Sequence, residues 1–306
     1  MVEPSVVEVR PDQFPEIASR VARIDEAARA ADGHPALGDA VRLDLEHPSA
    51  ESAGFFAGDD AYAHVARSDN ADPRHWVLGL AIAPGSRAAG TRPLLVAAAV
   101  RHVAARGGGR LVLWVLGATA DDDSDLAAVG LHPARDLYEM RVTLPVAGEP
   151  KWPAGVSVRT FDPATDTQAW LEVNNRAFAG HAEQGGWTAS TLERRLAEPW
   201  FDPTLFLVAF DADGMVGYDW LKVHEPHDLD PRLGEIYVIG VDPRAQGSGL
   251  GRALAIAGLH AIHDRGIGTG MLFSAADNEP ALKLYGALGF TVHRVDRAYE
   301  SEVAPL

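Results

Sequence analysis

The segment from Gln246 to Arg252 has the residue types of an anion-binding loop. Its sequence, QGSGLGR, lies between an apolar run that predicts a strand at 235–241 and a periodic run that predicts a helix at about 250–264. Glycine allows positive φ and close approach of a ligand, so consecutive N–H groups can point into one concavity at the helix N-terminus. Arg252 adds a positive charge there. We expect this loop to bind a diphosphate.

The plain alternative is a glycine-rich connection without a ligand, because short glycine patterns often occur by chance. The order of strand, loop and helix favours binding. The pattern differs from the dinucleotide fingerprint G-x-G-x-x-G, and it lacks the Lys-Ser/Thr ending of a P-loop. Those two nucleotide-binding folds are therefore disfavoured.

Other groups of reactive residues in the sequence are incomplete as sites. Pro226 interrupts the His224–Asp228 segment, and His260 with His263 lacks a third ligand, so we interpret these histidines as surface residues. The acidic run Asp121–Asp125 lacks the glycine and distal glutamate of a calcium loop. No serine lies in a G-x-S-x-G elbow, and the sequence has no cysteine. We expect neither a metal site nor serine or thiolate catalysis.

Length and charge limit the classes of partner. A chain of 306 residues is long enough for two ordinary domains. Its formal net charge of −16 disfavours nucleic acid or an anionic membrane as the main partner. No apolar stretch approaches the roughly 18 residues of a membrane span, and the N-terminus lacks a secretion-signal pattern. We expect a cytoplasmic monomer that binds neither nucleic acid nor membrane.

An internal repeat divides the chain. At a constant offset of 159 residues (239 minus 80), the aligned segments are 80–90 with 239–249 and 129–131 with 288–290. Two matches in one register without a gap indicate a duplicated domain. Proline and glycine interrupt any periodic pattern between Pro145 and Pro153. We predict two domains, residues 1–145 and 154–306.

The second half alternates between strand and helix patterns. We expect strands at 156–159, 205–210, 215–223, 235–241, 271–274 and 290–295, and helices at 165–178, 188–198, 250–264 and 280–288. The continuous apolar character of 235–241 suits a strand covered on both faces. Asn278 and Gly289 suit the start and the end of the last helix. The pattern predicts an α/β fold.

Motifs in this half resemble the GNAT acetyltransferase superfamily. They are the Q-x-x-G-x-G pattern of 246–251 after a strand that ends Val241-Asp242-Pro243, the pair Asp277-Asn278, and the run LYGALGF at 284–290. The resemblance is strong from Glu235 to about Tyr299, and the repeat extends it over the chain. It implies two tandem GNAT folds of the α/β (α+β) class, each a mixed, mostly antiparallel sheet flanked by helices.

Further segments narrow the resemblance. They are NNRAFAGHAEQGGWT at 174–188, WFDP at 200–203, KVH at 222–224 and GEIYV at 234–238. Together they are similar to the mycothiol synthase family, whose members are tandem GNAT proteins. This resemblance implies transfer of acetyl from acetyl-CoA to the cysteinyl amine of desacetylmycothiol, a cysteine–glucosamine–inositol thiol-sugar.

The resemblance assigns the chemistry to two residues. Acyl transfer from a thioester to an amine needs a neutral amine and a proton for the departing thiolate. Glu235 would accept the ammonium proton, directly or through a water, and Tyr285 would protonate the sulfur of coenzyme A. From the residues alone, Glu235 also fits an exposed strand-end carboxylate that only pairs with a nearby base, and Tyr285 also belongs to an apolar helical stripe.

The remaining assignments from the resemblance concern binding. Acetyl-CoA would contact Ile239, Gly240, Val241, Gln246, Gly247, Ser248, Gly249, Leu250, Gly251, Arg252, Asn278 and Lys283. The acceptor would contact Asp39, Glu183, Lys222 and Glu235. Taken singly, Glu183 and Lys222 also fit surface charges. Asp39 stands where the family usually has Glu, and Phe273 where relatives tend to have Tyr, which indicates an altered acceptor preference.

The first half lacks the corresponding chemistry at the same offset. Glu235 aligns with Trp76, Tyr285 with Leu126, Gly251 with Arg92, and Asp277-Asn278 with Ala118-Thr119. We expect residues 1–145 to be a degenerate copy that forms one wall of the acceptor cleft.

Two alternatives remain open. One is an N-acetyltransferase of another small amine or of a peptide N-terminus, which Asp39 and Phe273 support. The other is a non-catalytic acyl-CoA-binding sensor, which the presence of both Glu235 and Tyr285 disfavours.

Overall fold

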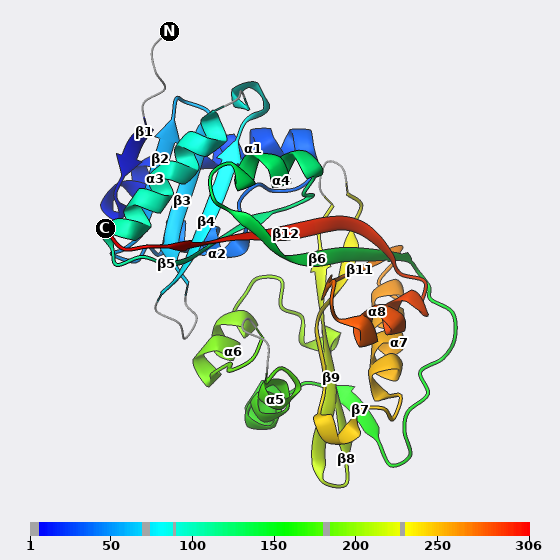
Figure 1. Cartoon of the computed structure of the whole chain (residues 1–306). Helices are drawn as coiled ribbons and strands as arrows, with labels where there is room; N and C mark the ends of the chain where they lie inside the picture. Colours follow the sequence, from blue (N-terminus) through cyan, green and yellow to red (C-terminus); the bar gives the residue numbers. More distant parts are fainter. Residues whose placement is uncertain (1–5, 69–73, 88–89, 180–183, 227–229) are drawn as a thin grey trace. The chain divides into compact units, whose positions relative to one another are not determined.

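The computed structural model describes residues 6–68, 74–87, 90–179, 184–226 and 230–306, except the side chains of Asp39 and Ala40. The chain forms two compact units. Unit 1 consists of Met1–Leu137 and Arg294–Leu306, and unit 2 of Tyr138–His293. Each unit is a mixed sheet flanked by helices (Figure 1). Within the described ranges, no helix is long and apolar enough to span a membrane.

Both halves of the sequence have the same order of elements, which confirms the duplication. The first half contains β1 (Val6–Val9), α1 (Phe14–Asp32), α2 (Asp39–Glu46), β2 (Ala53–Ala57), β3 (Ala61–Arg67), β4 (His75–Ile82), α3 (Thr91–Ala105), β5 (Gly109–Val115), α4 (Ala120–Ala127) and β6 (His132–Thr143). The second half contains β7 (Ser157–Thr160), α5 (Pro163–Ala177), α6 (Ala189–Leu196), β8 (Phe206–Asp211), β9 (Gly214–His224), β10 (Leu233–Val241), α7 (Leu250–His263), β11 (Thr269–Ala275), α8 (Glu279–Gly286) and β12 (Thr291–Val303). The predicted elements of the second half are all present, and only β12 is much longer than expected.

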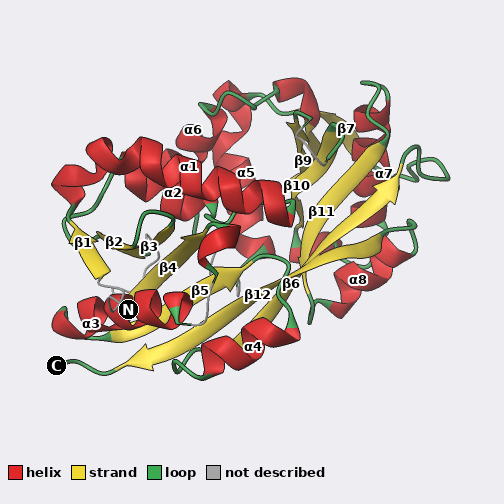
Figure 2. Ribbon diagram, turned by 90° about the horizontal axis from the view of Figure 1, so that it is seen from above, coloured by secondary structure: helices red, strands yellow, loops and turns green. Residues whose placement is uncertain are grey.

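Unit 1 has a sheet with the strand order β1-β2-β3-β4-β5-β12. Helices α3 and α4 cover one face and α1 and α2 the other (Figure 2). Leu95 of α3 and Leu126 of α4 belong to one core cluster, and Phe14 of α1 and Val41 of α2 to the other. Burial of these apolar faces, at about 25 cal/mol per Å², is the main favourable contribution to folding of the unit.

Unit 2 has the strand order β6-β11-β10-β9-β8-β7. Helices α7 and α8 lie on one face of its sheet, and α5 and α6 lie on the other (Figure 1). Ile256 of α7 packs in one core with Leu272 of β11, and Trp170 of α5 packs in the other with Trp220 of β9. Both faces of β10 are therefore covered, as its continuous apolar sequence predicts.

The last strand of each half leaves the unit in which that half begins. Residues 294–306 belong to unit 1, where β12 pairs antiparallel with β5, from Arg297 opposite Val115 to Val303 opposite Gly109. From Tyr138 onward, β6 belongs to unit 2. The compact units therefore differ at their ends from the predicted domains 1–145 and 154–306.

Charged contacts within unit 1 fix the exchanged strand β12. The Arg297 guanidinium donates to Asp136 of β6 at 2.6 Å and to Asp123 of α4 at 2.9 Å. The hydroxyl of buried Tyr299 donates to Asp123 at 2.6 Å. Because these partners are distant in sequence, no local pattern indicates them. The predicted strand 290–295 therefore ends before β12 does.

A fully buried carboxyl in unit 2 has no hydrogen-bond partner among the described residues. Asp219 of β9 is 0% exposed, and neither of its oxygens is bonded there. It faces α7 so closely that a Cβ added at Gly258 would lie 2.2 Å from Oδ2. Burial raises the pKa of Asp219 well above its ordinary range. We infer that this carboxyl is protonated in the folded protein at neutral pH.

Replacing Asp219 by Asn should stabilise the protein at neutral and alkaline pH. In the unfolded chain an Asp ionises at about pH 4. Since the folded-state pKa is raised, wild-type stability falls as pH rises above the unfolded value and until the folded value is reached. An amide carries no charge and avoids this loss. We expect a higher Tm than wild type at about pH 8 and a nearly equal Tm at about pH 4, by scanning calorimetry.

The control is Asp213→Asn in the same hairpin, where the side chain is 87% exposed. It should change the free energy of unfolding by less than about 0.5 kcal/mol at both pH values. A Tm of Asp219→Asn below that of wild type at alkaline pH would show that the native carboxyl is charged and stabilised.

Candidate functional site

The site begins where two parallel strands of unit 2 separate. β10 and β11 pair only over Gly234–Ile236 and Gly270–Leu272. β10 continues to pair with β9 as far as Val241, with a register shift between Ile236 and Val238. The edge of 237–241 that faces away from β9 therefore has no strand partner in the described part of the chain. Its backbone N–H and C=O groups are available to a ligand.

The predicted backbone contacts Ile239, Gly240 and Val241 lie in this segment of β10, and the backbone groups of Ile239 and Val241 face the open edge. The glycine has its own structural cause, because a Cβ at Gly240 would come within 2.6 Å of the Tyr218 ring. The close packing of Tyr218 thus requires Gly240, whatever the ligand.

The loop before α7 has the conformation expected of an anion nest. Gly247 has a φ of 77° and Gly249 a φ of 87°, and a Cβ at either position would meet no atom within 4 Å. These glycines are needed for the backbone conformation, since nothing crowds them. Among the described residues, no acceptor is bonded to the N–H groups of Gly247, Gly249, Gly251 or Arg252. The exposed Arg252 lies in the first turn of the same helix.

Three other predicted loop residues hold the loop in place. The Ser248 hydroxyl donates to the carbonyl of Ala245 at 2.6 Å and accepts from the N–H of Leu250 at 3.4 Å. The Gln246 amide donates to the carbonyl of Val241 at 3.5 Å. The Leu250 side chain is 1% exposed and lies in the core. These side chains fix the loop on the strand end, and the ligand would meet backbone.

An ion pair that sequence analysis missed anchors the start of the loop. Oδ2 of buried Asp242 accepts from Nη2 and Nε of Arg176 in α5 at 2.6 and 2.9 Å, and Oδ1 accepts from the N–H of Arg244 at 3.1 Å. Burial opposes ionisation, but the Arg244 N–H and the Arg176 guanidinium outweigh it and lower the pKa of Asp242. The Asp-Pro step after the strand was the available signal, since Asp often accepts from the backbone two residues on.

The predicted base, Glu235, is buried in β10, with 8% of its side chain exposed. Its Oε2 lies 2.7 Å from Nε2 of His224, the last residue of β9. The alternative interpretation of Glu235 is therefore wrong about its exposure, but the pairing with a nearby base that it expected is present. His224 is only 34% exposed in its side chain, so its interpretation as a free surface histidine is also wrong. The partner strand provides the imidazole that the local sequence could not reveal.

Lys222 lies directly opposite Glu235 on β9. Its ammonium is 4.8 Å from the ring centre of Trp200 and 5.6 Å from that of Tyr237, a cation–π arrangement. Lys222 is half-buried, which contradicts its interpretation as a plain surface charge. Strand pairing thus brings Lys222, His224 and Glu235 together.

Two predicted acceptor contacts cannot be placed. Glu183 lies outside the described residues, and the side chain of Asp39, the first residue of α2 in unit 1, is also outside the description. Phe273 of β11 is 39% exposed.

Tyr285, the predicted acid, lies on α8 and is 6% exposed. It shares a core cluster with Ile236 and Leu272, the last paired residues of β10 and β11, and its ring contacts that of Phe290. Burial raises the pKa of Tyr285. The phenol therefore keeps its proton at neutral pH and can donate it.

The last two predicted cofactor residues make local contacts. The Asn278 Oδ1 accepts from the N–H of Ala281 at 3.2 Å and caps α8, as expected from the sequence. Lys283 is 78% exposed and pairs with Glu279 at 3.1 Å, an interaction worth at most about 1 kcal/mol. Their contact with a cofactor stays a prediction.

The remaining histidines form no metal site. His260 and His263 are half-buried, and His227 lies outside the described residues. The ring of His260 is 3.3 Å from the carbonyl of Val146. Across the described ranges, no group of three or more His, Asp or Glu side chains could hold a metal ion.

In unit 1 the parallel strands β4 and β5 separate as β10 and β11 do in unit 2, but the positions of Glu235 and Tyr285 have apolar side chains. β4 pairs with β5 over His75–Leu78 and with β3 as far as Ile82. At the aligned positions, Trp76 and Leu126 are 0% exposed. Arg92, in the position of Gly251, pairs with Asp122 at 2.7 Å.

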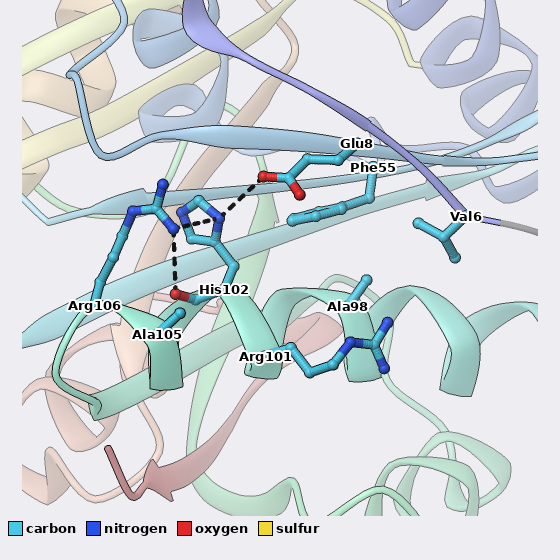
Figure 3. Close-up of a pocket in the computed structure, with 8 residues that line it drawn as sticks. All are labelled: Val6, Glu8, Phe55, Ala98, Arg101, His102, Ala105 and Arg106. Atoms are coloured by element: carbon cyan, nitrogen blue, oxygen red, sulfur yellow. Dashed lines mark hydrogen bonds and ion pairs between the residues drawn. The ribbon is translucent and has the colours of Figure 1, made fainter. Parts of the chain in front are cut away.

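A separate pocket in unit 1 contains none of the predicted residues (Figure 3). It lies between β1, β2 and α3, and Figure 3 shows His102 between Glu8 and Arg106. The Nδ1 of His102 is 3.0 Å from Arg106 Nη1 and 3.6 Å from Glu8. Burial lowers the pKa of His102, which favours a neutral ring.

Comparison with known proteins agrees with this geometry. Residues 168–290 match the family described as Acetyltransferase (GNAT) family. Solved structures with this fold include a GCN5-related N-acetyltransferase from Sphaerobacter thermophilus (TM-score 0.72, 23% identity, 98% of this chain and 96% of that one). Another is a tandem GNAT protein from the clavulanic acid biosynthesis pathway (TM-score 0.73, 18% identity, 99% of each chain).

Curated relatives give a narrower assignment. The chain is 41% identical over 291 residues to the mycothiol acetyltransferase of Thermomonospora curvata, covering 92% of this chain and 93% of that protein. It is 46% identical over 230 residues to that of Pseudarthrobacter chlorophenolicus, covering 74% and 70%. The chain therefore belongs to the mycothiol acetyltransferase family, a group of acyltransferases with the GNAT fold.

Proposed function

We propose that this chain transfers the acetyl group of acetyl-CoA to the cysteinyl amine of desacetylmycothiol, which gives mycothiol and CoA. The observation that carries the proposal is that the Glu235 carboxylate is buried in β10. The same strand has an open edge beyond Ile236, and the glycine loop with positive φ follows its end. The relatives named mycothiol acetyltransferase support the acceptor. The proposed place of action is the cytoplasm, and the proposed form a monomer.

The unpaired backbone donors of unit 2 fit acetyl-CoA. The N–H groups of Gly247, Gly249 and Gly251 would bind the diphosphate, where the helix dipole also favours negative charge. Arg252 would add a charged donor. The free edge of 237–241 would bind the pantetheine amides as an added strand does. The thioester would thereby be directed toward Glu235.

The reaction follows from the positions of the two titratable groups. Glu235 takes a proton from the acceptor ammonium, and the neutral nitrogen attacks the thioester carbonyl carbon. Backbone N–H groups of β10 stabilise the oxyanion. The C–S bond then breaks as Tyr285 donates its proton to the departing sulfur. The nitrogen gives up its second proton, directly or through water, to the Tyr285 phenolate, and Glu235 releases its proton to solvent. Because burial raises the pKa of Tyr285, its phenol proton is present at neutral pH.

Fewer described residues lie where they could contact the acceptor than where they could contact acetyl-CoA. Lys222 and Glu235 lie opposite each other and offer a cation and a carboxylate to sugar hydroxyls. Phe273 lacks the hydroxyl that relatives tend to have, which keeps another small amine or a peptide N-terminus as an alternative acceptor. A sensor without activity is disfavoured, because the chain has both Glu235 and Tyr285 at the positions of the proposed base and acid.

Unit 1 is proposed to lack catalysis. Its counterparts of Glu235 and Tyr285, Trp76 and Leu126, are apolar side chains in the core. They can neither accept nor donate the protons that the reaction moves.

Glu235→Gln should lower kcat with acetyl-CoA and desacetylmycothiol by about 10²- to 10⁴-fold, since general base catalysis contributes that much. Tyr285→Phe should lower kcat by about 10²-fold. Product formation is measured by mass spectrometry, as the gain of one acetyl group. The Kd for acetyl-CoA should stay within about twofold of wild type in both variants. Near-full turnover by either variant would remove the role assigned to that residue.

Arg252→Ala should raise the Kd for acetyl-CoA by about three- to tenfold at low salt, as expected for one exposed charge-assisted contact. The difference from wild type should shrink at high salt, since screening weakens it. Calorimetric titration measures both. Arg194→Ala, at an exposed arginine of α6, is the matched control and should leave the Kd unchanged. Equal Kd values for the two variants would place the diphosphate elsewhere.

A further inference from the structure

Among the described residues, only one of the two carboxylate oxygens of the proposed base, Glu235, has a hydrogen-bond partner. Oε2 of Glu235 is 2.7 Å from Nε2 of His224. No other described residue forms a hydrogen bond with Oε1. Since an ionised carboxylate can only accept, the imidazole must carry its proton on Nε2 and donate it. In the neutral ring this leaves a lone pair on Nδ1.

The two strands make this contact rigid. Glu235 pairs with Lys222 in the β9–β10 register, and Gly234 pairs with Val223, while Leu233 pairs with His224 itself. His224 is therefore diagonal to Glu235, a separation that long side chains span. With both backbones held in one ladder, the bond restricts rotation of the carboxylate about its last torsion.

The nearby ammonium of Lys222 is engaged differently. It lies over the rings of Trp200 and Tyr237, and no ion pair between Lys222 and Glu235 is present among the described residues. His224 is thus the only described side chain that fixes the direction of the carboxylate. An ordinary half-exposed ion pair would add at most about 1 kcal/mol to stability and nothing to catalysis.

We propose that His224 is a positioning residue for acetyl transfer: its Nε2–H holds Oε2 of Glu235, so that Oε1 faces the acceptor amine. The inference rests on the proposed function, because it requires Glu235 to act as the base. Pre-orienting a catalytic group in this way lowers the barrier without contact between His224 and the substrate.

His224→Leu should lower kcat by about tenfold, because the carboxylate then samples unproductive orientations. The KM for acetyl-CoA should stay within about twofold, since the loop and the free edge are unchanged. His224→Gln retains an N–H donor at a similar reach and should recover kcat to within about threefold of wild type. The control is His293→Gln, at an exposed position of β12, which should leave kcat unchanged.

A double-mutant cycle separates positioning from packing. In the Glu235→Gln background, His224→Leu should lower the residual rate by less than about twofold, since the group to be positioned is gone. An equal loss in both backgrounds, or no recovery by His224→Gln, would overturn the positioning role. If His224→Leu does not fold by circular dichroism, the Gln variant and its cycle with Glu235→Gln decide the question.

The same assays distinguish the inference from the proposed function. Absence of acetylation by the wild type would overturn the proposed function itself. Wild-type turnover with an inactive Glu235→Gln and a fully active His224→Leu would leave the function standing and overturn only the role of His224.

Discussion

The site depends on one constraint in the sheet of unit 2: parallel pairing between β10 and β11 ends at Ile236 and Leu272, while antiparallel pairing between β10 and β9 continues to Val241. Buried backbone groups that lack a partner are costly, so a strand edge left open inside a fold suits a ligand with complementary amides. The register shift at the same point supports the separation, since such irregularities bend strands and often adjoin functional sites.

The side chains around this edge mainly fix the conformation of the loop between β10 and α7. Asp242, with Arg176 and the Arg244 N–H, fixes the start of the loop, and Ser248 closes it on itself. Gly247 and Gly249 supply the positive φ that turns N–H groups outward. The loop is thus preorganised, so little ordering of it would oppose binding. Glu235 and Tyr285, the proposed base and acid, are both buried.

The two units have the same order of elements but differ at the positions of the proposed base and acid. Unit 1 retains the order of elements and the early end of β4–β5 pairing, yet Trp76 and Leu126 fill its core at the positions of the base and the acid. Because the last strands are exchanged, the chain passes between the units at two places. In unit 1, Arg297 stabilises the exchanged strand β12 through its contacts with Asp123 and Asp136. The two units therefore share an order of elements without sharing the residues that we propose for catalysis.

The sequence by itself determined the repeat, the elements of the second half and the glycine loop, because these depend on local periodicity, on turn chemistry and on motifs contiguous in the chain. The roles of Glu235 and Tyr285 rest on the family resemblance and are proposals. Only the tertiary structure decided that β12 belongs to unit 1, that His224 contacts Glu235, that Arg176 anchors Asp242 and that Asp219 is buried without a partner. The physical reason is that strand pairing and helix packing join residues whose separation in sequence carries no periodic signal, and burial, charge and hydrogen bonding follow from that contact.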